Sequence, residues 1–369
     1  MIYLDNGATS FPKPLAVRRA VLDALTECAN PGRGGYEAAM AADNRIFSCR
    51  EAAGRLFSCA PEQVVLTTSC THGLNIAIRS LVKPGTKVAV TGFEHNAVIR
   101  PLHGLGAELL VAGRRLFDWE DTLEAFQGAL EAGAQAAVFT HVSNVFGYIL
   151  PVEEMARLCR DRGIPFVIDA AQSAGVLPVN FDALGADFVA MPGHKGLLGP
   201  QGTGLLLCRD GAEPLLYGGT GSLSASREMP DFLPDRLEPG TLNVPGFAGL
   251  AAGLELVTAL GPERIGAMEH AQLLRCARGL ENLGLRVFSG PHQGGTLSFL
   301  PGQDCEAAAQ MLARRGIAVR AGLHCAPLAH ESAGTLETGT VRLSFGYNTS
   351  DRQTDLFLRS AAKFPPFPN

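Results

Sequence analysis

Short runs of consecutive apolar residues recur through the first two thirds of the chain, and stretches with helical periodicity separate most of them. Runs without polar alternation are typical of strands that are buried on both faces of a sheet. The predicted strands are residues 64–68, 87–91, 136–141, 165–169, 187–191 and 204–208. Strands that alternate with helices predict an α/β fold with a mainly parallel, doubly wound sheet.

The two ends of the chain have different patterns. Helical periodicity covers residues 15–29, and an irregular stretch rich in Gly and Pro at 217–246 precedes an alanine-rich helix at 246–260. Beyond that helix, strands are predicted at 296–299, 318–320 and 340–344. We therefore expect a large domain at 15–250 and a smaller α+β domain at 251–369.

Composition favours an enzyme that acts on a small molecule. A chain of 369 residues with 46% hydrophobic residues can bury a large core, and a net charge of −5 provides no basic surface for nucleic acid. No apolar run is long enough to cross a membrane, and no leader pattern begins the chain. The nine cysteines are odd in number and form no C-x-x-C pair, so we expect a reducing cytoplasm and no metal site.

Two reactive side chains follow neighbouring predicted strands. Asp169 ends the strand at 165–169, and Lys195 ends the run Met-Pro-Gly-His-Lys after the strand at 187–191. Ligands of open α/β sheets bind at these carboxyl ends. A lysine can hold the aldehyde of pyridoxal phosphate as an imine while a carboxylate keeps its ring nitrogen protonated. The pair therefore suggests this cofactor. The alternatives are that Asp169 only caps a helix and that Lys195 is an ordinary exposed lysine.

Several separated segments resemble the class-V aminotransferases of pyridoxal phosphate fold type I. The closest resemblance is to the cysteine desulfurases of the SufS-like and selenocysteine lyase branch. It runs from Tyr3 to Ser344 and includes the spacing of 26 positions between Asp169 and Lys195 (195 − 169). The resemblance implies fold type I, a homodimer, and an N-terminal segment, residues 1–14, that packs near the small domain.

The resemblance also assigns residues around the cofactor ring. His95, in a Glu-His-x-Ala pattern, would stack on the ring and move protons near the imine. Asn144 would contact the ring hydroxyl and the substrate, and Gln172 would reach the same hydroxyl. Taken singly, His95 could be a polar loop residue and Asn144 a turn former.

A phosphate site is predicted where the strand at 64–68 runs into a helix. Backbone N–H groups at a helix start attract anions, and Cys70 and Thr71 stand there, although simple helix capping is the alternative. Cys70 replaces a Thr of the family pattern, and Pro192 replaces a common Ser or Thr phosphate ligand. The resemblance implies that His194 assists at the phosphate and that Thr241 reaches the phosphate of the partner subunit, unless Thr241 is only a surface turn residue.

The segment at 319–328 resembles the desulfurase loop whose cysteine accepts sulfur from substrate. Its cysteine is Cys325, and nearby Arg320 and His324 could lower the pKa of that thiol. The alternative is that Cys325 is a small buried residue, like most free cysteines. We expect the other eight cysteines to be structural.

Arginines complete the expected substrate site. Arg342 matches the arginine that binds the substrate α-carboxylate, for which its planar fork is suited. Arg320 is a further candidate for contact with substrate, beside Asn144. Arg33 matches a loop near the entrance of the site and is a secondary candidate.

Together these residues predict a cysteine desulfurase with Lys195, His95 and Cys325 as catalytic residues. The enzyme would convert L-cysteine to L-alanine, with the sulfur passing to Cys325 as a persulfide and then to an acceptor protein. A selenocysteine lyase that acts on L-selenocysteine, a C–S lyase and a class-V aminotransferase are alternatives on the same scaffold. A non-catalytic module that binds a sulfur carrier is a further one.

Overall fold

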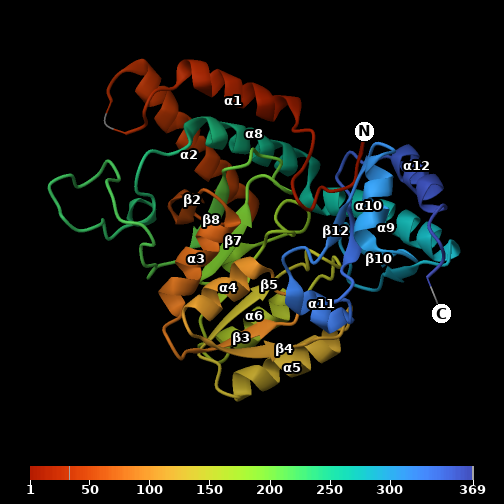
Figure 1. The fold of residues 1–369 in the computed structure, drawn as a ribbon. Helices are drawn as coiled ribbons and strands as arrows, with labels where there is room; N and C mark the ends of the chain where they lie inside the picture. The colour runs from red at the N-terminus through yellow and green to blue at the C-terminus, as the bar shows by residue number, and fades with distance from the viewer. Residues whose placement is uncertain (33, 368–369) are drawn as a thin grey trace.

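A seven-stranded sheet forms the centre of the protein in this computed structural model, which describes residues 1–32 and 34–367 (Figure 1). Its order is β2-β8-β7-β6-β5-β3-β4. The strands are β2 (Val64–Thr67), β3 (Lys87–Thr91), β4 (Glu108–Ala112), β5 (Ala136–Thr140), β6 (Phe166–Asp169), β7 (Phe188–Pro192) and β8 (Gly204–Cys208). Of these seven strands, only β8 runs in the direction opposite to the other six. The predicted α/β fold with a mainly parallel sheet is confirmed.

Both faces of this sheet are apolar, because successive strand residues point to opposite sides. Val65 and Leu206 belong to the core under α3 (Cys70–Leu81) and α4 (Asn96–Gly104). Val64 and Leu207 belong to the core on the opposite face. Helices with side chains in that second core include α2 (Glu37–Phe57), α5 (Trp119–Glu131), α6 (Val152–Arg160), α7 (Phe181–Leu184) and α8 (Val244–Leu260). The sheet is therefore doubly wound, as expected.

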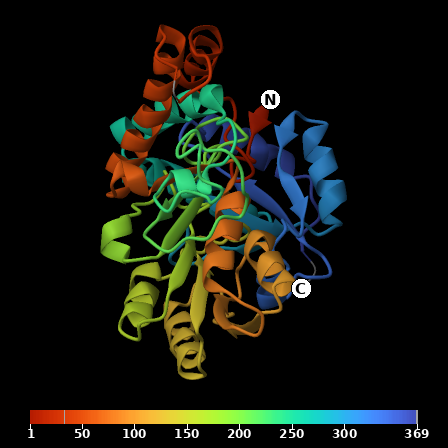
Figure 2. The ribbon, with the colours of Figure 1, turned by 90° about the vertical axis from the view of Figure 1, so that its left-hand side faces the viewer.

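A smaller antiparallel sheet with the order β12-β13-β10-β9 lies toward the C-terminus. Its strands are β9 (Arg286–Phe288), β10 (Thr296–Leu300), β12 (Arg320–Gly322) and β13 (Thr340–Ser344). The helices of this part are α9 (Pro262–Asn282), α10 (Cys305–Ala313), α11 (Pro327–Ala333) and α12 (Asp351–Ala361). The first strand of the chain, β1 (Ile2–Tyr3), pairs in parallel with β11 (Ile317–Ala318), beside this sheet (Figure 2).

The sequence pattern located most elements and missed three strands, β1, β4 and β9. The helices predicted at 15–29 and 246–260 are α1 (Leu15–Glu27) and α8, which pack against each other (Figure 1). The strand predicted at 318–320 is divided between β11 and β12. β4 was missed because it is an edge strand whose residues are mostly only half-buried, and β9 because it is short.

Helix α8 is buried along most of its length between α1, α2 and the large sheet. Among the described residues, no single helix is long and apolar enough to cross a membrane. The pair α8 and α9 reaches that threshold together by length and composition alone, but it is bent by 80° at its break.

Candidate active site

Five strands that run in the same direction end at one edge of the large sheet, and a chemically active side chain follows or ends each of them. Cys70 follows β2, His95 follows β3, Asn144 follows β5, Asp169 ends β6 and Lys195 follows β7. All five line a single cavity of about 110 Å³. The residues that the sequence predicted around a cofactor ring are therefore brought together.

Asp169 lies in the wall of this cavity and is only 2% exposed. Its Oδ1 accepts a hydrogen bond from the Ala171 backbone N–H at 2.9 Å and another from the Cys70 thiol at 3.5 Å. Burial, and then the charge of Asp169, raise the pKa of Cys70 well above its usual value. Cys70 is therefore a neutral donor to the carboxylate.

Lys195 extends from the loop after β7 into the same cavity. Burial lowers the pKa of its ammonium group, and the nearby Asp169 opposes that shift without cancelling it. A lysine with a lowered pKa has more of its amine in the neutral form, which is the nucleophilic one. The environment thus suits an amine that attacks a carbonyl.

His95 caps the start of α4. Its Nδ1 accepts a hydrogen bond from the Ala97 backbone N–H at 3.0 Å, which leaves the ring proton on Nε2. Burial lowers the pKa of His95, so its imidazole is neutral at physiological pH. A ring fixed in this way can lie against a planar cofactor without adding a charge.

Helix α3 presents its N-terminus to the cavity, with Cys70 and Thr71 in the wall. Ser69 is the capping residue, because its hydroxyl accepts the His72 backbone N–H at 3.1 Å. The capping alternative therefore applies to Ser69, and the first-turn N–H groups still offer a site for an anion. Pro192, which provides no hydroxyl, also lines this cavity.

Gln172 and Asn144 connect the cavity wall to distant segments. Gln172 Nε2 donates to the Gly7 carbonyl at 3.0 Å, and Asn144 Nδ2 donates to the His324 carbonyl at 2.8 Å. Both side chains line the cavity, where the sequence placed them beside the ring hydroxyl of the expected cofactor.

The donor set of the cavity fits pyridoxal phosphate. Asp169 is suited to pair with the ring nitrogen, and Lys195 is suited to bind the aldehyde. The start of α3 is suited to bind the phosphate. Asn144 Oδ1 and His194 Nδ1 are buried and have no hydrogen-bond partner among the described residues. Buried polar atoms of this kind are normally satisfied, so these two are suited to a bound ligand. Burial lowers the pKa of His194 to about 4, so it is uncharged.

Thr241 is the one predicted cofactor residue that this chain does not bring to the cavity. It is exposed on the segment between β8 and α8, which projects from the molecule in Figure 1. The base of that segment is fixed, because the buried Glu238 carboxylate binds Arg50 at 2.8 and 2.5 Å and accepts the Leu66 N–H.

Cys325 is the one exposed cysteine of the nine. It lies in the turn between β12 and α11, where His324 and Cys325 have φ values of 51° and 56°. Two successive residues with a side chain in the left-handed region are uncommon, and neighbours must hold them. Asn144 binds the His324 carbonyl, and the Asn96 backbone N–H donates to the Cys325 carbonyl at 2.7 Å.

His324 packs against a second histidine. Its ring stacks on His330, with centroids 5.7 Å apart and planes 13° apart, and burial lowers its pKa to about 2. His324 is therefore neutral at physiological pH and supplies no positive charge to the thiol. The other expected cation, Arg320, is bound to Asp5, with Nη2 at 3.0 Å from Oδ2.

Arg342 is almost completely buried in β13. Its Nη2 donates to Asp5 Oδ1 at 2.7 Å and its Nη1 to the Asn144 carbonyl at 3.0 Å. Its Nε is buried and has no hydrogen-bond partner among the described residues. The sequence assigned no role to Asp5, although that residue belongs to the first matching segment. Arg33 lies outside the described residues.

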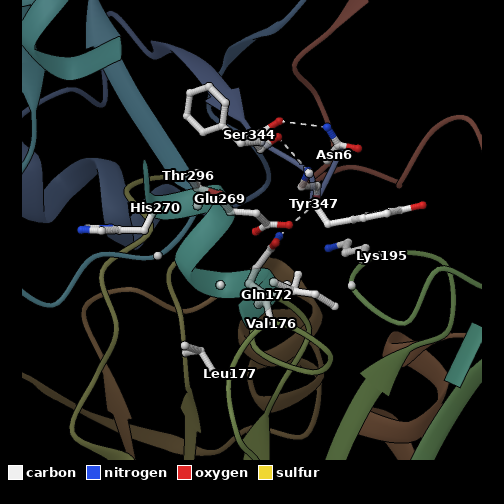
Figure 3. A pocket seen from close by; sticks show the side chains of 18 of the residues that line it. Asn6, Gln172, Val176, Leu177, Lys195, Glu269, His270, Thr296, Ser344 and Tyr347 are labelled. Carbon is white, nitrogen blue, oxygen red and sulfur yellow. Dashed lines mark hydrogen bonds between the residues drawn. The ribbon is translucent and has the colours of Figure 1, made fainter. Parts of the chain in front are cut away.

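A larger cavity of about 450 Å³ continues from the first one, sharing Lys195 and Gln172 with it. Figure 3 shows Lys195 and Glu269 entering this space from different elements. Glu269 has no hydrogen-bond partner among the described residues, and burial raises its pKa to about 8. This cavity could not be predicted from the sequence, because its walls come from seven separate segments.

The chain matches the family described as Aminotransferase class-V over residues 2–357. It is 34% identical to a probable cysteine desulfurase of Methanothermobacter thermautotrophicus, over 95% of this chain and 91% of that protein. The apo structure of a cysteine desulfurase from Thermococcus onnurineus NA1 superposes with a TM-score of 0.88 at 32% identity, covering 98% of this chain and 94% of the other. A complex of the cystine C-S lyase C-DES shares the fold, with a TM-score of 0.85 at 23% identity and coverage of 99% and 98%.

Proposed function

The chain belongs to the class-V aminotransferase family, and from this premise we propose that it is a pyridoxal phosphate-dependent cysteine desulfurase. It converts L-cysteine to L-alanine and passes the sulfur to Cys325 as a persulfide, from which an acceptor protein takes it. Membership of this family and the fold type I architecture agree with the resemblance found in the sequence.

The observation that carries this proposal is the position of Asn144 between two centres. Its side chain lines the cavity of Lys195 and Asp169, and its amide donates to the carbonyl of His324, the residue before Cys325. A thiol on an exposed turn is thus held next to the cofactor cavity. An aminotransferase needs the cavity but has no use for the thiol.

Pyridoxal phosphate, when bound, supplies a carbonyl for the amino group of the substrate and an electron sink for its α-carbon. Lys195 holds the cofactor and moves the proton of the substrate α-carbon through Nζ. Asp169 holds the proton on the ring nitrogen, and Arg342 binds the substrate α-carboxylate through its free Nε. These groups fix the substrate while its Cβ–S bond breaks.

Cys325 receives the sulfur. Its thiolate attacks the substrate sulfur, a new S–S bond forms, and the electron pair of the Cβ–S bond remains with the substrate carbon, which is protonated on the way to alanine. The exposure of Cys325 allows an acceptor thiol to take the outer sulfur afterwards. An exposed free thiol and eight further unpaired cysteines agree with a reducing cytoplasm.

The proposed enzyme is a homodimer in which Thr241 completes the phosphate site of the partner subunit. Exposed large apolar side chains on α1 and α2 support this arrangement: Leu22, Leu25, Met40 and Phe47. Large apolar side chains exposed together are typical of a surface that a partner covers.

The test is the set of products that the cofactor-loaded protein releases from L-cysteine under reductant. Alanine and sulfide in equal amounts are expected, whereas pyruvate would indicate a C–S lyase. Lys195→Ala should abolish turnover, and Cys325→Ala should keep the cofactor and lose sulfur transfer. Cys59→Ala, a half-buried cysteine at the end of α2, is the matched control and should keep full activity.

Turnover of L-selenocysteine with none of L-cysteine would replace the proposal by a selenocysteine lyase. Amino-group transfer to a keto acid would indicate an aminotransferase. A protein that gains no cofactor absorption band after addition of pyridoxal phosphate would have to be a non-catalytic module. Full desulfuration by Cys325→Ala would contradict the role of that thiol.

A further inference from the structure

Asp5 places one carboxylate between Arg342, which the proposed reaction uses, and Arg320, which begins the strand before the Cys325 turn. Oδ1 accepts from Arg342 Nη2 at 2.7 Å, and Oδ2 accepts from Arg320 Nη2 at 3.0 Å and from Arg320 Nε at 3.2 Å. The Asp5 and Arg342 side chains are 12% and 3% exposed, whereas that of Arg320 is half exposed. Asp5 thus neutralises a buried guanidinium and binds a second one at the surface.

The backbone around Asp5 is fixed on both sides. The Leu4 N–H donates to the Ala318 carbonyl at 2.9 Å, and the Ser344 N–H donates to the Leu4 carbonyl at 2.8 Å. The Asn6 N–H donates to the Ser344 carbonyl at 3.2 Å. Because strands β11 and β13 hold the residues next to it, the Asp5 carboxylate has a defined position relative to both arginines.

The contacts continue from Arg342 to the sulfur-accepting turn. Arg342 Nη1 binds the Asn144 carbonyl at 3.0 Å, and the Asn144 amide binds the His324 carbonyl at 2.8 Å. Arg320 begins β12, the strand that leads into the same turn. Asp5 therefore contacts Arg320, in the strand before the turn, and Arg342, which is linked through Asn144 to His324 within the turn.

We propose that Asp5 is a positioning residue that couples recognition of the substrate carboxylate at Arg342 to the placement of the Cys325 turn through Arg320. This inference rests on the proposed function. Without the carboxylate, two guanidinium groups would repel each other, and buried Arg342 would lose its compensating charge. Arg342 would then turn away from the position in which its Nε is free, and β12 would lose its tie to the N-terminal segment.

The test uses Asp5→Asn, which keeps the shape of the side chain and removes its charge. Binding of L-alanine, the proposed product, to the cofactor-loaded protein is measured by the change in cofactor absorbance, and we expect the Kd to rise at least about tenfold. Alkylation of Cys325 by iodoacetamide in the cofactor-free protein is followed by peptide mass spectrometry, and we expect it to be about threefold faster or more. Asp355→Asn, which removes an exposed partner of Arg275, is the control and should change neither quantity.

Arg320→Gln separates the two halves of the proposal and remains informative if Asp5→Asn does not fold. It should accelerate alkylation of Cys325, because β12 then loses its contact with Asp5 while Arg342 keeps that carboxylate. An unchanged alkylation rate in either variant would overturn the coupling, and an unchanged Kd in Asp5→Asn would overturn the role at Arg342. Alkylation does not depend on turnover, so failure of the desulfurase assay would leave this test valid.

Discussion

The thiol of Cys70 donates to Asp169 Oδ1 across 3.5 Å, so the first residue of α3 contacts the carboxylate at the end of β6. The sequence placed Cys70 at the phosphate, as a substitute for a hydroxyl. Its backbone remains at the helix start, but its side chain faces the other end of the cofactor cavity. A weak thiol donor therefore supplements the stronger Ala171 N–H, which binds the same oxygen at 2.9 Å.

This arrangement predicts unequal effects of two substitutions. Cys70→Ala removes only a weak donor, and we expect kcat for L-cysteine to fall by less than about threefold. Asp169→Asn removes the charge that holds a proton on the ring nitrogen, and we expect kcat to fall by roughly a hundredfold or more. Steady-state alanine release with saturating cofactor measures both. Equal effects would mean that Asp169 does not bind the ring nitrogen.

Because the pKa of Lys195 is lowered, we predict that this residue destabilises the cofactor-free fold by an amount that depends on pH. Burial holds this pKa below the 10.5 of an exposed lysine, so the unfolded chain binds the proton more tightly. Stability therefore rises with pH between the folded and the unfolded pKa. We expect cofactor-free Lys195→Met to melt at a higher temperature than the wild type near pH 7, with a difference that shrinks as the pH approaches 10.5.

Thermal denaturation at several pH values checks this prediction. Lys83→Met is the control, because Lys83 is exposed, and its melting temperature should differ from the wild type by a small and constant amount. A difference for Lys195→Met that stays constant over the same pH values would show that Lys195 is not the group responsible.

Thr241 gives a prediction about subunits. If it binds the phosphate of the partner, Thr241→Ala should weaken cofactor binding roughly tenfold or more, because a hydrogen bond to a charged group is lost. A mixed dimer with Lys195→Ala then has one complete site, with Lys195 from one subunit and Thr241 from the other. Unfolding and refolding the two variants together should restore activity at cofactor concentrations too low to load Thr241→Ala alone, and no recovery in verified mixed dimers would contradict the shared site.

Much of the fold could be predicted because buried parallel strands have a local signature. The runs that became β5, β6 and β7 are buried at every position and are apolar except at Thr140 and Asp169, and the reactive residues at their ends follow from strand direction alone. β4 lacks that signature because most of its residues are only half-buried. Local patterns therefore identify fully buried strands, including β2 at the other edge of the sheet, better than half-buried ones.

Contacts between distant segments could not be predicted in the same way. Asp5 and Arg342 are separated by 337 positions, and neither residue alone indicates an ion pair. The neutral state of His324 depends on burial against His330, which only the packed turn creates. Asp169, Lys195 and Arg342 could thus be identified from the sequence, whereas the role of Asp5 and the charge state of His324 required the structure.

Gly147 and Gly163 have nearly the same φ, 66° and 64°, but differ in their surroundings. A Cβ at Gly147 would lie 2.4 Å from the Thr296 carbonyl oxygen, whereas one at Gly163 would meet no atom within 4 Å. Gly163→Ala should therefore cost only the left-handed backbone, about 1 kcal/mol. Gly147→Ala should cost roughly 2–5 kcal/mol and weaken cofactor binding, because the same turn carries Asn144. Urea unfolding measures both, and equal losses would show that backbone conformation alone requires glycine at position 147.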